Sequence, residues 1–304
     1  MEKKFKSGFV GIIGRPNVGK STLLNAFVGS RISIISAIPQ TTRHQIKGIL
    51  NVEEGQIVFV DTPGIHSFRD SLTIHLNTIA KQSVDGCDLL LYVADVSRCL
   101  GREEQDVMNF LSSQSIKVIM VLNKMDLGGK FLPDYISAWK SLLAQKGVAE
   151  DLLVAYLPTC AKSGKNVDEL TKVILAHLPE NPAFYDAQTT TDFPLKFRVA
   201  DAVREQLFTH LSKELPHSLA VEVEEIREKK ALTYIKVVVY VNRTSQKKII
   251  VGTKGAILKE IGSRARPRIE KIIGRKVYLD IWVEVMSDWQ NKPRILQELG
   301  YWLT

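Results

Sequence analysis

The octapeptide at residues 14–21 reads Gly14-Arg15-Pro16-Asn17-Val18-Gly19-Lys20-Ser21, and Thr22 follows it. A glycine, four intervening residues and then Gly-Lys-Ser form the pattern of a loop whose backbone N–H groups surround phosphate oxygens. An apolar run at 9–13 precedes the loop and a helical pattern at 20–28 follows it, as such a loop requires. We therefore expect Lys20 to contact the β- and γ-phosphates of a nucleotide and the Ser21 hydroxyl to bind Mg²⁺.

The first 180 residues alternate short apolar runs with amphipathic stretches. Buried strands are predicted at 9–13, 56–60, 89–95, 117–122 and 153–158. Helices are predicted at 20–28, 71–84, 103–112, 133–145 and 167–177. Strands that alternate with helices predict an α/β domain with a mostly parallel sheet covered on both faces. A strand at 46–52 joined to 56–60 by Glu-Glu-Gly predicts a hairpin, and therefore one antiparallel strand at an edge of the sheet.

Two further polar segments belong with the phosphate loop. Asp61-Thr62-Pro63-Gly64 follows the strand at 56–60 and lies about forty residues after Lys20. We expect the Asp61 carboxylate to hold the Mg²⁺ shell through water and the Gly64 N–H to sense the γ-phosphate. Between them lies the loop Ile38-Pro39-Gln40-Thr41-Thr42-Arg43, which is predicted to close over the γ-phosphate. Thr42 is the preferred Mg²⁺ ligand and Thr41 the competitor, with a plain surface loop as the alternative.

The segment after the strand at 117–122 is expected to select the base. Asn123-Lys124-Met125-Asp126 places a carboxylate where guanine offers N1–H and a 2-amino group. Adenine has neither donor, and leaving a polar group of the site unpaired can discriminate about 10⁴-fold. Asn123 would contact guanine N7 or tie the base loop to the phosphate loop, and the stem of Lys124 would cover the ring. Cys160-Ala161-Lys162 would offer backbone N–H groups to guanine O6.

These five motifs, in this order, resemble those of the translation-factor-type GTPases, which implies binding of GTP and GDP with Mg²⁺. Cys160 departs from the family, which usually has serine there, and we expect a small effect because the backbone contact is kept. The resemblance implies that Lys20, Thr42 and Gly64 act in hydrolysis. Ile65 stands where many small GTPases have a water-orienting glutamine, so slow turnover is expected. Asn17 resembles an asparagine that binds K⁺ in some related GTPases, with a helix-capping role as the alternative.

Length, charge and cysteine usage indicate a second domain and an anionic partner. The 304 residues favour two domains, which we place at 1–178 and 193–304 with a Pro-containing linker at 179–192. The net charge of +8 lies mostly after residue 180, and residues 243–276 carry eleven basic side chains. This asymmetry points to nucleic acid or an anionic membrane. Three scattered cysteines and no apolar run of about 18 residues lead us to expect a cytoplasmic protein.

The C-terminal part is predicted to be helix, two strands, two helices and a strand. Ile249-Ile250-Val251-Gly252-Thr253-Lys254-Gly255 precedes another helical pattern and resembles the Gly-x-x-Gly segment of an α+β type II KH domain. Such a domain holds about four nucleotides of single-stranded RNA. The residues expected to contact RNA are Lys248, Ile249, Ile250, Gly252, Thr253, Lys254, Gly255, Ile257, Arg264 and Arg268.

The GTPase motifs followed by one KH-like segment resemble, over essentially the whole chain, the Era family of bacterial GTPases. The resemblance implies 30S ribosomal subunit assembly, binding near the 3′ end of small-subunit (16S) ribosomal RNA, and peripheral contact with the inner membrane. A monomer is expected, and Trp302 is given no role. Two other interpretations stay open at this point. One is a KH RNA-binding module whose nucleotide domain does not turn over, and the other is a P-loop kinase or ATPase, against which Asn123 and Asp126 argue.

Overall fold

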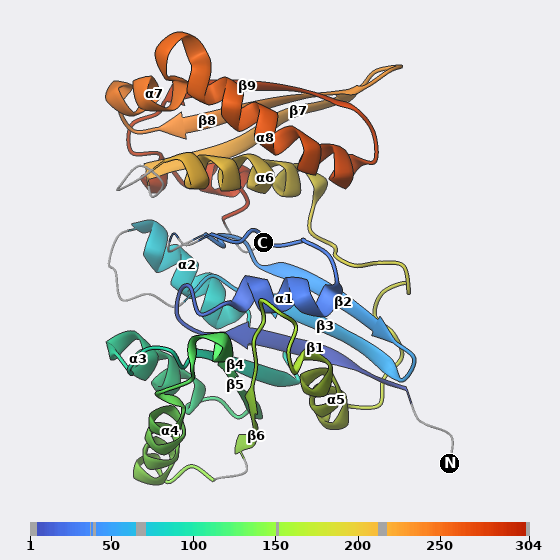
Figure 1. The fold of residues 1–304 in the computed structure, drawn as a ribbon, viewed down its shortest axis with the longest axis vertical. Helices are drawn as coiled ribbons and strands as arrows, with labels where there is room; N and C mark the ends of the chain where they lie inside the picture. The colour runs from blue at the N-terminus through green and yellow to red at the C-terminus, as the bar shows by residue number, and fades with distance from the viewer. Residues whose placement is uncertain are drawn as a thin grey trace. The chain divides into compact units, whose positions relative to one another are not determined.

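The computed structural model describes residues 5–36, 38, 41–64, 71–149, 152–211 and 218–301. These residues form two compact units (Figure 1). The first contains residues up to 33 and from 42 to 192, and the second contains the described part of 34–41 together with the chain from 193 onward. Pro39, Gln40, Ile65 and Trp302, which the motif analysis mentions, lie outside the described residues.

The first unit is built on a six-stranded sheet with the order β2-β3-β1-β4-β5-β6. The strands are β1 (Lys6–Ile13), β2 (Ile46–Val52), β3 (Gly55–Asp61), β4 (Leu89–Asp95), β5 (Val118–Asn123) and β6 (Leu153–Pro158). All neighbours are parallel except the edge strand β2, which pairs antiparallel with β3. The predicted sheet with one antiparallel edge strand is therefore confirmed. Because parallel strands end at the same edge, the motifs that follow β1, β3 and β5 come together there.

Helices cover both faces of this sheet, since every residue of the central strand β4 is buried. The helices are α1 (Lys20–Val28), α2 (Ser71–Gln82), α3 (Arg102–Leu111), α4 (Leu132–Lys146) and α5 (Val167–His177), with a short 3₁₀ turn η1 (Met125–Leu127). Side chains of β4 and β5, among them Leu90, Val118 and Leu122, pack with α3 and α4 around Trp139, which is fully buried. The predicted helices agree with these bounds to within two residues.

The segment 179–192, expected as a linker, runs along the first unit. Thr191 forms an isolated bridge with Gly48 of β2. The side-chain oxygen of Gln56 accepts hydrogen bonds from the backbone N–H groups of Phe184 and Tyr185, at 2.7 and 3.0 Å. These contacts fasten the segment to the strands β2 and β3.

The second unit has the order helix, two strands, two helices, strand, as predicted for a type II KH domain. Its main elements are α6 (Leu195–His210), β7 (Leu219–Glu228), β8 (Thr233–Val241), α7 (Thr244–Val251), η4 (Thr253–Gly255), α8 (Ala256–Ile273) and β9 (Val277–Val285). The 3₁₀ turn η5 (Trp289–Asn291) and α9 (Pro293–Glu298) follow. The sheet order is β7-β8-β9, with β9 parallel to β8. Valine and isoleucine side chains from one sheet face meet α6 and α8 in the core.

The short segment 34–41 belongs to the second unit through specific contacts with α6. Ile38 packs against the apolar core of that unit. The backbone N–H of Ile35 donates to the Glu205 carboxylate at 3.2 Å, and the Thr41 carbonyl accepts from Arg204 at 3.0 Å. Arg204 is only 2% exposed and also donates to the Tyr301 hydroxyl at 2.8 Å. In the part of the chain that the structure describes, no helix is long and apolar enough to cross a bilayer.

Candidate nucleotide site and nucleic-acid interface

The phosphate loop lies between the end of β1 and the start of α1, where the sequence places it. Gly19 has φ 104°, a conformation that suits glycine, and a Cβ there would lie 2.4 Å from the side-chain nitrogen of Asn123. A Cβ on Gly14 would lie 2.4 Å from the Val93 carbonyl oxygen. Neither position has room for a Cβ, because residues of β4 and β5 come too close to the loop. The two glycines therefore let the loop fold tightly at the edge of the sheet.

Lys20 points back into the loop. Its ammonium donates to the carbonyl oxygens of Gly14 and Arg15, at 2.9 and 3.0 Å, and the residue is 6% exposed. Burial lowers the pKa of Lys20 to about 8, and the nearby Asp61 carboxylate only partly offsets that effect. A buried ammonium held by two carbonyls is suited to take up a phosphate group as a stronger partner.

Three oxygen-bearing side chains converge beside Lys20. The Ser21 hydroxyl lies 2.9 Å from the Thr42 hydroxyl and donates to Asp61 Oδ2 at 2.8 Å. The other oxygen of Asp61, Oδ1, is buried and has no hydrogen-bond partner among the described residues. Burial raises the pKa of Asp61, although Lys20 and two serine hydroxyls favour the charged form. A carboxylate and two hydroxyls of this kind are hard oxygen ligands, and they fit Mg²⁺.

The choice between the two threonines rests on where their hydroxyls point. Thr42 faces Ser21, whereas the Thr41 hydroxyl donates to the carbonyl of Ile38. This arrangement favours Thr42 as the ligand.

The motif Asp61-Thr62-Pro63-Gly64 also lies close to the phosphate loop, because a Cβ on Gly64 would be 2.9 Å from the backbone nitrogen of Pro16. The Thr62 hydroxyl donates to the Ile12 carbonyl at 3.1 Å and fixes the turn that contains Pro63 to the end of β1.

At the base end, Asn123 joins three segments. Its side-chain nitrogen donates to the Val18 carbonyl at 2.8 Å, and its side-chain oxygen accepts from the Ala161 N–H at 2.9 Å. Of the two roles predicted for Asn123, this geometry supports the one that ties the base loop to the phosphate loop. Asp126 is exposed at the start of the next turn, and the Cys160 thiol donates to it at 3.2 Å. The Cys160 side chain thus orients the carboxylate expected to read guanine.

Lys124 and Lys162 flank the base loop. Lys124 has a left-handed backbone, with φ 64°, and its ammonium binds Asp95 Oδ2 at 2.8 Å. Lys162 is exposed.

Asn17 is exposed on the phosphate loop, and its backbone is left-handed, with φ 61°. Gly19 is the residue at the N-cap of α1, so the geometry does not give Asn17 the capping role considered above.

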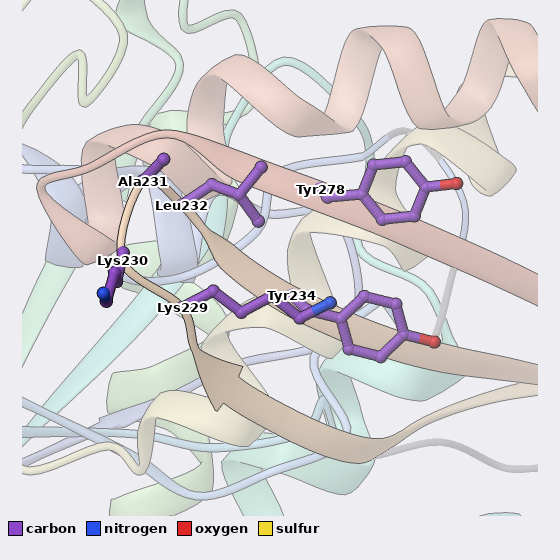
Figure 2. Close-up of a pocket in the computed structure, with 6 residues that line it drawn as sticks. All are labelled: Lys229, Lys230, Ala231, Leu232, Tyr234 and Tyr278. Atoms are coloured by element: carbon purple, nitrogen blue, oxygen red, sulfur yellow. The ribbon is translucent and has the colours of Figure 1, made fainter.

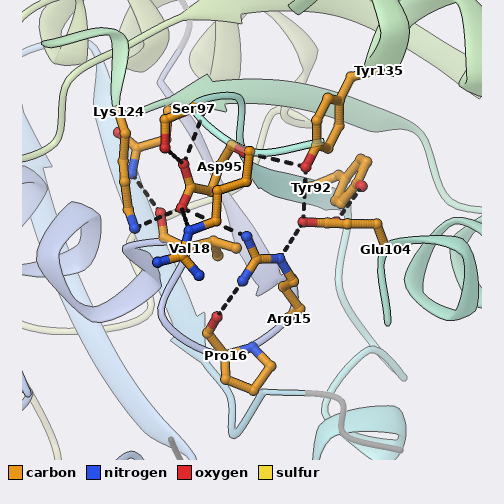
Figure 3. A network of polar contacts seen from close by, with 12 residues as sticks. Arg15, Pro16, Val18, Tyr92, Asp95, Ser97, Glu104, Lys124 and Tyr135 are labelled. Atoms are coloured by element: carbon orange, nitrogen blue, oxygen red, sulfur yellow. Dashed lines mark hydrogen bonds and ion pairs between the residues drawn. The ribbon is translucent and has the colours of Figure 1, made fainter. Parts of the chain in front are cut away.

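A buried polar network behind the loop was not predicted from the sequence (Figure 3). Arg15 donates to Glu104 at 2.6 Å and lies 3.6 Å from Asp95, the residue that also binds Lys124. Glu104 is 1% exposed and accepts from the Tyr92 and Tyr135 hydroxyls, at 2.8 and 3.3 Å. Burial raises the pKa of Glu104, while Arg15 and the tyrosines favour its ionised form. Asp95 therefore links the phosphate loop to the base loop.

The signal for Asp95 was present in the sequence. Asp95 ends β4, the strand between β1 and β5, so its carboxylate lies at the same sheet edge as the phosphate and base loops. Glu104 gave no such signal, because it lies in the first turn of an amphipathic helix, where acidic residues are common.

In the second unit, the Gly-x-x-Gly segment lies between α7 and α8 as expected. Gly252 and Gly255 have φ 69° and 80°, and Lys254 between them is exposed with φ 50°. A Cβ on Gly252 would lie 2.7 Å from Ile257, whereas a Cβ on Gly255 would meet nothing within 4 Å. The loop thus presents Thr253 and Lys254 directly before the N-terminus of α8.

Two residues expected to contact RNA lie elsewhere. Ile250 is fully buried in the core, whereas its neighbour Ile249 is 52% exposed. Successive residues on a helix point about 100° apart, so both could not face the same surface. Arg268 forms an ion pair with Glu205 and is 16% exposed. Lys248 and Arg264 are exposed, and Arg264 also pairs with Glu260 at 2.7 Å.

Comparison with known proteins agrees with this site. Residues 9–124 match the family of 50S ribosome-binding GTPases, and residues 214–290 match the KH domain family. The fold and the site thus define a P-loop GTPase that carries a C-terminal KH domain. The chain is 42% identical over 299 residues to the GTPase Era of Carboxydothermus hydrogenoformans, with 98% of each chain covered. It is 41% identical to that of Geobacter metallireducens, with 99% of each covered. The chain therefore belongs to the Era family of GTPases.

Solved structures give the same result. The chain is similar to Era in complex with MgGDPNP and nucleotides 1506-1542 of 16S ribosomal RNA, with a TM-score of 0.90 and 38% identity. It is equally similar to a variant of Aquifex aeolicus Era bound to GDP·AlF4⁻, with a TM-score of 0.89 and 38% identity. Each match covers 98% of this chain and 100% of the other.

Proposed function

We propose that this protein is a GTP-dependent switch that binds single-stranded RNA at the 3′ end of small-subunit ribosomal RNA during 30S assembly. The observation that carries the proposal is the full-length similarity to an Era structure that contains both MgGDPNP and a 16S ribosomal RNA segment. The chain carries residues suited to each ligand. The Ser21–Thr42–Asp61 cluster faces the phosphate loop, and the Gly252–Gly255 loop precedes α8.

At the phosphate end, Lys20 would exchange its bonds to the Gly14 and Arg15 carbonyls for bonds to the β- and γ-phosphates. The backbone N–H groups from Asn17 to Thr22 would surround the phosphates, in the loop that contains Pro16. Ser21 and Thr42 would hold Mg²⁺ directly, and Asp61 through water. When bound, the ion neutralises charge on the phosphate oxygens. Gly64, already close to Pro16, would donate its N–H to the γ-phosphate, and both Thr42 and Gly64 would lose a partner after hydrolysis.

At the base end, Asp126 would accept hydrogen bonds from guanine N1–H and the 2-amino group, held in position by the Cys160 thiol. The Ala161 N–H would lie near guanine O6, and Lys124 and Lys162 would flank the ring. The variant Asp126→Asn tests this assignment. An asparagine amide can donate to a 2-oxo group, so the variant should prefer xanthosine triphosphate over GTP. Retained preference for GTP would contradict the role of Asp126.

Binding of RNA is tested with a labelled single-stranded RNA from the 3′ end of 16S ribosomal RNA. Affinity is measured with a GTP analogue, with GDP and without nucleotide. Gly255→Asp places a carboxylate against the phosphates and should weaken binding at least tenfold. Gly274→Asp is the matched control, because Gly274 has the same φ of 80°, has no atom within 4 Å of where a Cβ would stand, and lies at the other end of α8. Equal binding in all three nucleotide states would leave two independent binding domains.

K⁺ is proposed as an additional cofactor because Asn17 is exposed on the phosphate loop with a left-handed backbone. The side-chain oxygen of Asn17 would bind the ion, which would supply the charge that an arginine finger supplies in other GTPases. GTP turnover in KCl should then exceed turnover in NaCl, and Asn17→Ala should remove the difference. Equal rates of the unchanged protein in the two salts would exclude this role.

The remaining proposals concern the state and place of the protein in the cell. We propose a cytoplasmic monomer that contacts the 30S subunit and touches the inner membrane peripherally. The basic composition of the C-terminal part supports an anionic surface as partner. Sedimentation velocity tests the monomer, and co-sedimentation with 30S subunits or with anionic vesicles tests each contact separately.

A further inference from the structure

A shallow pocket in the second unit has its neighbouring carboxylates already paired. It lies at the turn between β7 and β8 and is lined by Lys229, Lys230, Ala231, Leu232, Tyr234 and Tyr278 (Figure 2). Beside it, Asp280 accepts a hydrogen bond from the Tyr234 hydroxyl at 2.8 Å, and Glu228 pairs with Arg275 at 3.3 Å. Asp61 of the nucleotide site differs, because it is fully buried and its Oδ1 has no hydrogen-bond partner among the described residues. The groups that hold its other oxygen, Oδ2, therefore decide how Oδ1 is presented.

Two serine hydroxyls donate to Asp61 Oδ2, and one of them lies outside the nucleotide motifs. Ser21 of the phosphate loop donates at 2.8 Å, and Ser33 donates at 3.1 Å. Ser33 is fully buried, and among the described residues its hydroxyl donates to Asp61 alone. Ser21 is itself expected to bind the ion through its oxygen. Ser33 is therefore the donor whose function is to hold Asp61.

Asn25 of α1 holds the backbone of Ser33. Its side-chain nitrogen donates to the Ser33 carbonyl at 2.8 Å. Its side-chain oxygen accepts from the backbone N–H groups of Ile32 and Ser33, at 2.9 and 3.0 Å. One side-chain amide thus satisfies both backbone groups of Ser33. Because Asn25 lies on the helix that follows the phosphate loop, the Ser33 hydroxyl is fixed relative to that loop.

Ser33 is also the point at which the chain leaves the first unit. It is the last residue of that unit before the segment 34–41, and Thr42 is the first residue after the segment. Both ends are connected to Asp61, Ser33 directly and Thr42 through the Ser21 hydroxyl. Thr42 and Ser21 would change partners when they bind Mg²⁺, whereas Ser33 would keep its bond to Asp61 because α1 holds its backbone.

We propose that Ser33 is a positioning residue for Mg²⁺, which holds Asp61 so that Oδ1 is available to the water of the Mg²⁺ shell, and that Asn25 positions Ser33. These roles rest on the Mg²⁺ site of the proposed function, and they add two residues that do not touch the ion. Groups that hydrogen-bond to the ligands of a metal orient those ligands, and the loss of one typically weakens metal binding about 10–100-fold. Asp61 would contact the ion through water, so we expect the lower end of that range.

The dependence of GDP binding on Mg²⁺ tests this role. Affinity for a fluorescent GDP is measured in EDTA and at rising free Mg²⁺, and the readout is the Mg²⁺ concentration that gives half of the gain in affinity. Ser33→Ala should raise this concentration about tenfold and change the affinity in EDTA less than twofold. Ser33→Cys keeps a weaker donor of similar size and should give a smaller rise.

Ser7→Ala is the matched control for removing a buried serine hydroxyl. Ser7 is also fully buried, and its hydroxyl donates to the Pro182 carbonyl at 2.6 Å. It lies at the opposite end of β1 from the phosphate loop, so this variant should leave the half-maximal Mg²⁺ concentration unchanged.

A double variant tests whether Asn25 acts through Ser33. Asn25→Ala should also raise the half-maximal Mg²⁺ concentration. Combined with Ser33→Ala, it should raise that concentration no further than Ser33→Ala does alone, because the hydroxyl that Asn25 positions is then missing. Rises that multiply in the double variant would overturn the role of Asn25. If Ser33→Ala does not fold, Ser33→Cys takes its place in each comparison.

Two results would overturn the role of Ser33. If Ser33→Ala weakens GDP binding equally in EDTA and in Mg²⁺, Ser33 supports only the fold, and urea denaturation of the nucleotide-free variant would show the loss. If Ser33→Ala changes nothing while Ser21→Ala raises the half-maximal Mg²⁺ concentration, the ion binds without the help of Ser33. A different result separates the proposed function from this role. If Mg²⁺ does not strengthen GDP binding by the unchanged protein, the Mg²⁺ site itself fails, and the role of Ser33 fails with it.

Discussion

The side chain of Asn123 donates to the backbone carbonyl of Val18 at 2.8 Å, which joins the base loop directly to the phosphate loop. Asn123 is 2% exposed and also holds the Ala161 N–H, so removing it leaves two buried backbone groups unpaired. Asn123→Ala should lower the free energy of unfolding by about 2–4 kcal/mol, measured by urea denaturation without nucleotide. Asn109→Ala is the control, because Asn109 is an exposed asparagine within α3. An unchanged free energy of unfolding would show that the hydrogen bonds of Asn123 to Val18 and Ala161 do not stabilise the protein.

The thiol of Cys160 is a weaker donor than a hydroxyl, and it faces Asp126 at 3.2 Å. Cys160→Ser should therefore hold the carboxylate more firmly and tighten GDP binding two- to fivefold, with a smaller gain for inosine diphosphate, which keeps N1–H but lacks the 2-amino group. Cys99→Ser, at an exposed cysteine, should leave both affinities unchanged. If neither nucleotide binds more tightly, the hydroxyl at position 160 does not act on Asp126.

Lys20 should make nucleotide binding depend on pH. Its pKa of about 8 in the nucleotide-free protein lies below the ordinary value of 10.5, because burial disfavours the charge. A bound triphosphate favours the ammonium and raises that pKa. Lys20 is mostly protonated at pH 7, so binding there should take up about 0.1 proton, whereas at pH 9 it should take up about 0.9.

Calorimetry in two buffers of different ionisation enthalpy measures this uptake. Affinity should fall as pH rises above 8, by at most tenfold per pH unit. The exposed Lys162 provides the control, since Lys162→Gln should leave the uptake unchanged. No difference in uptake between pH 7 and pH 9 would contradict the lowered pKa.

Glu104 should stabilise the protein through Arg15 rather than through contact with nucleotide. Glu104→Ala leaves the guanidinium and two tyrosine hydroxyls without their shared acceptor and should cost about 3–5 kcal/mol of unfolding free energy. Glu103→Ala, one position earlier on α3, should cost less than about 1 kcal/mol. Combining Glu104→Ala with Arg15→Met should restore part of the loss, since no unpaired charge then stays buried. If the double variant loses the sum of the two single losses in unfolding free energy, Glu104 and Arg15 are not energetically coupled.

Much of the fold and of the nucleotide site could be predicted because each motif is a run of neighbours at a strand end. Parallel strands gather those ends at one edge, so order along the chain was enough to assemble the site. Contacts between distant residues gave no such signal: Glu104 reaches Arg15, and Arg204 reaches Thr41, across 89 and 163 positions. The prediction for Ile250 failed for a local reason, because an isoleucine pair in a helix does not reveal which member faces the core.

The bond between Arg204 and Thr41 has a consequence for dissecting this protein into parts. The segment 34–41 packs with the second unit, although the residues on either side of it belong to the first. A fragment that begins at Phe193 would therefore lack a piece of its own unit, and the buried guanidinium of Arg204 would lose the Thr41 carbonyl. A single cut of the polypeptide therefore cannot give each unit all of its own residues.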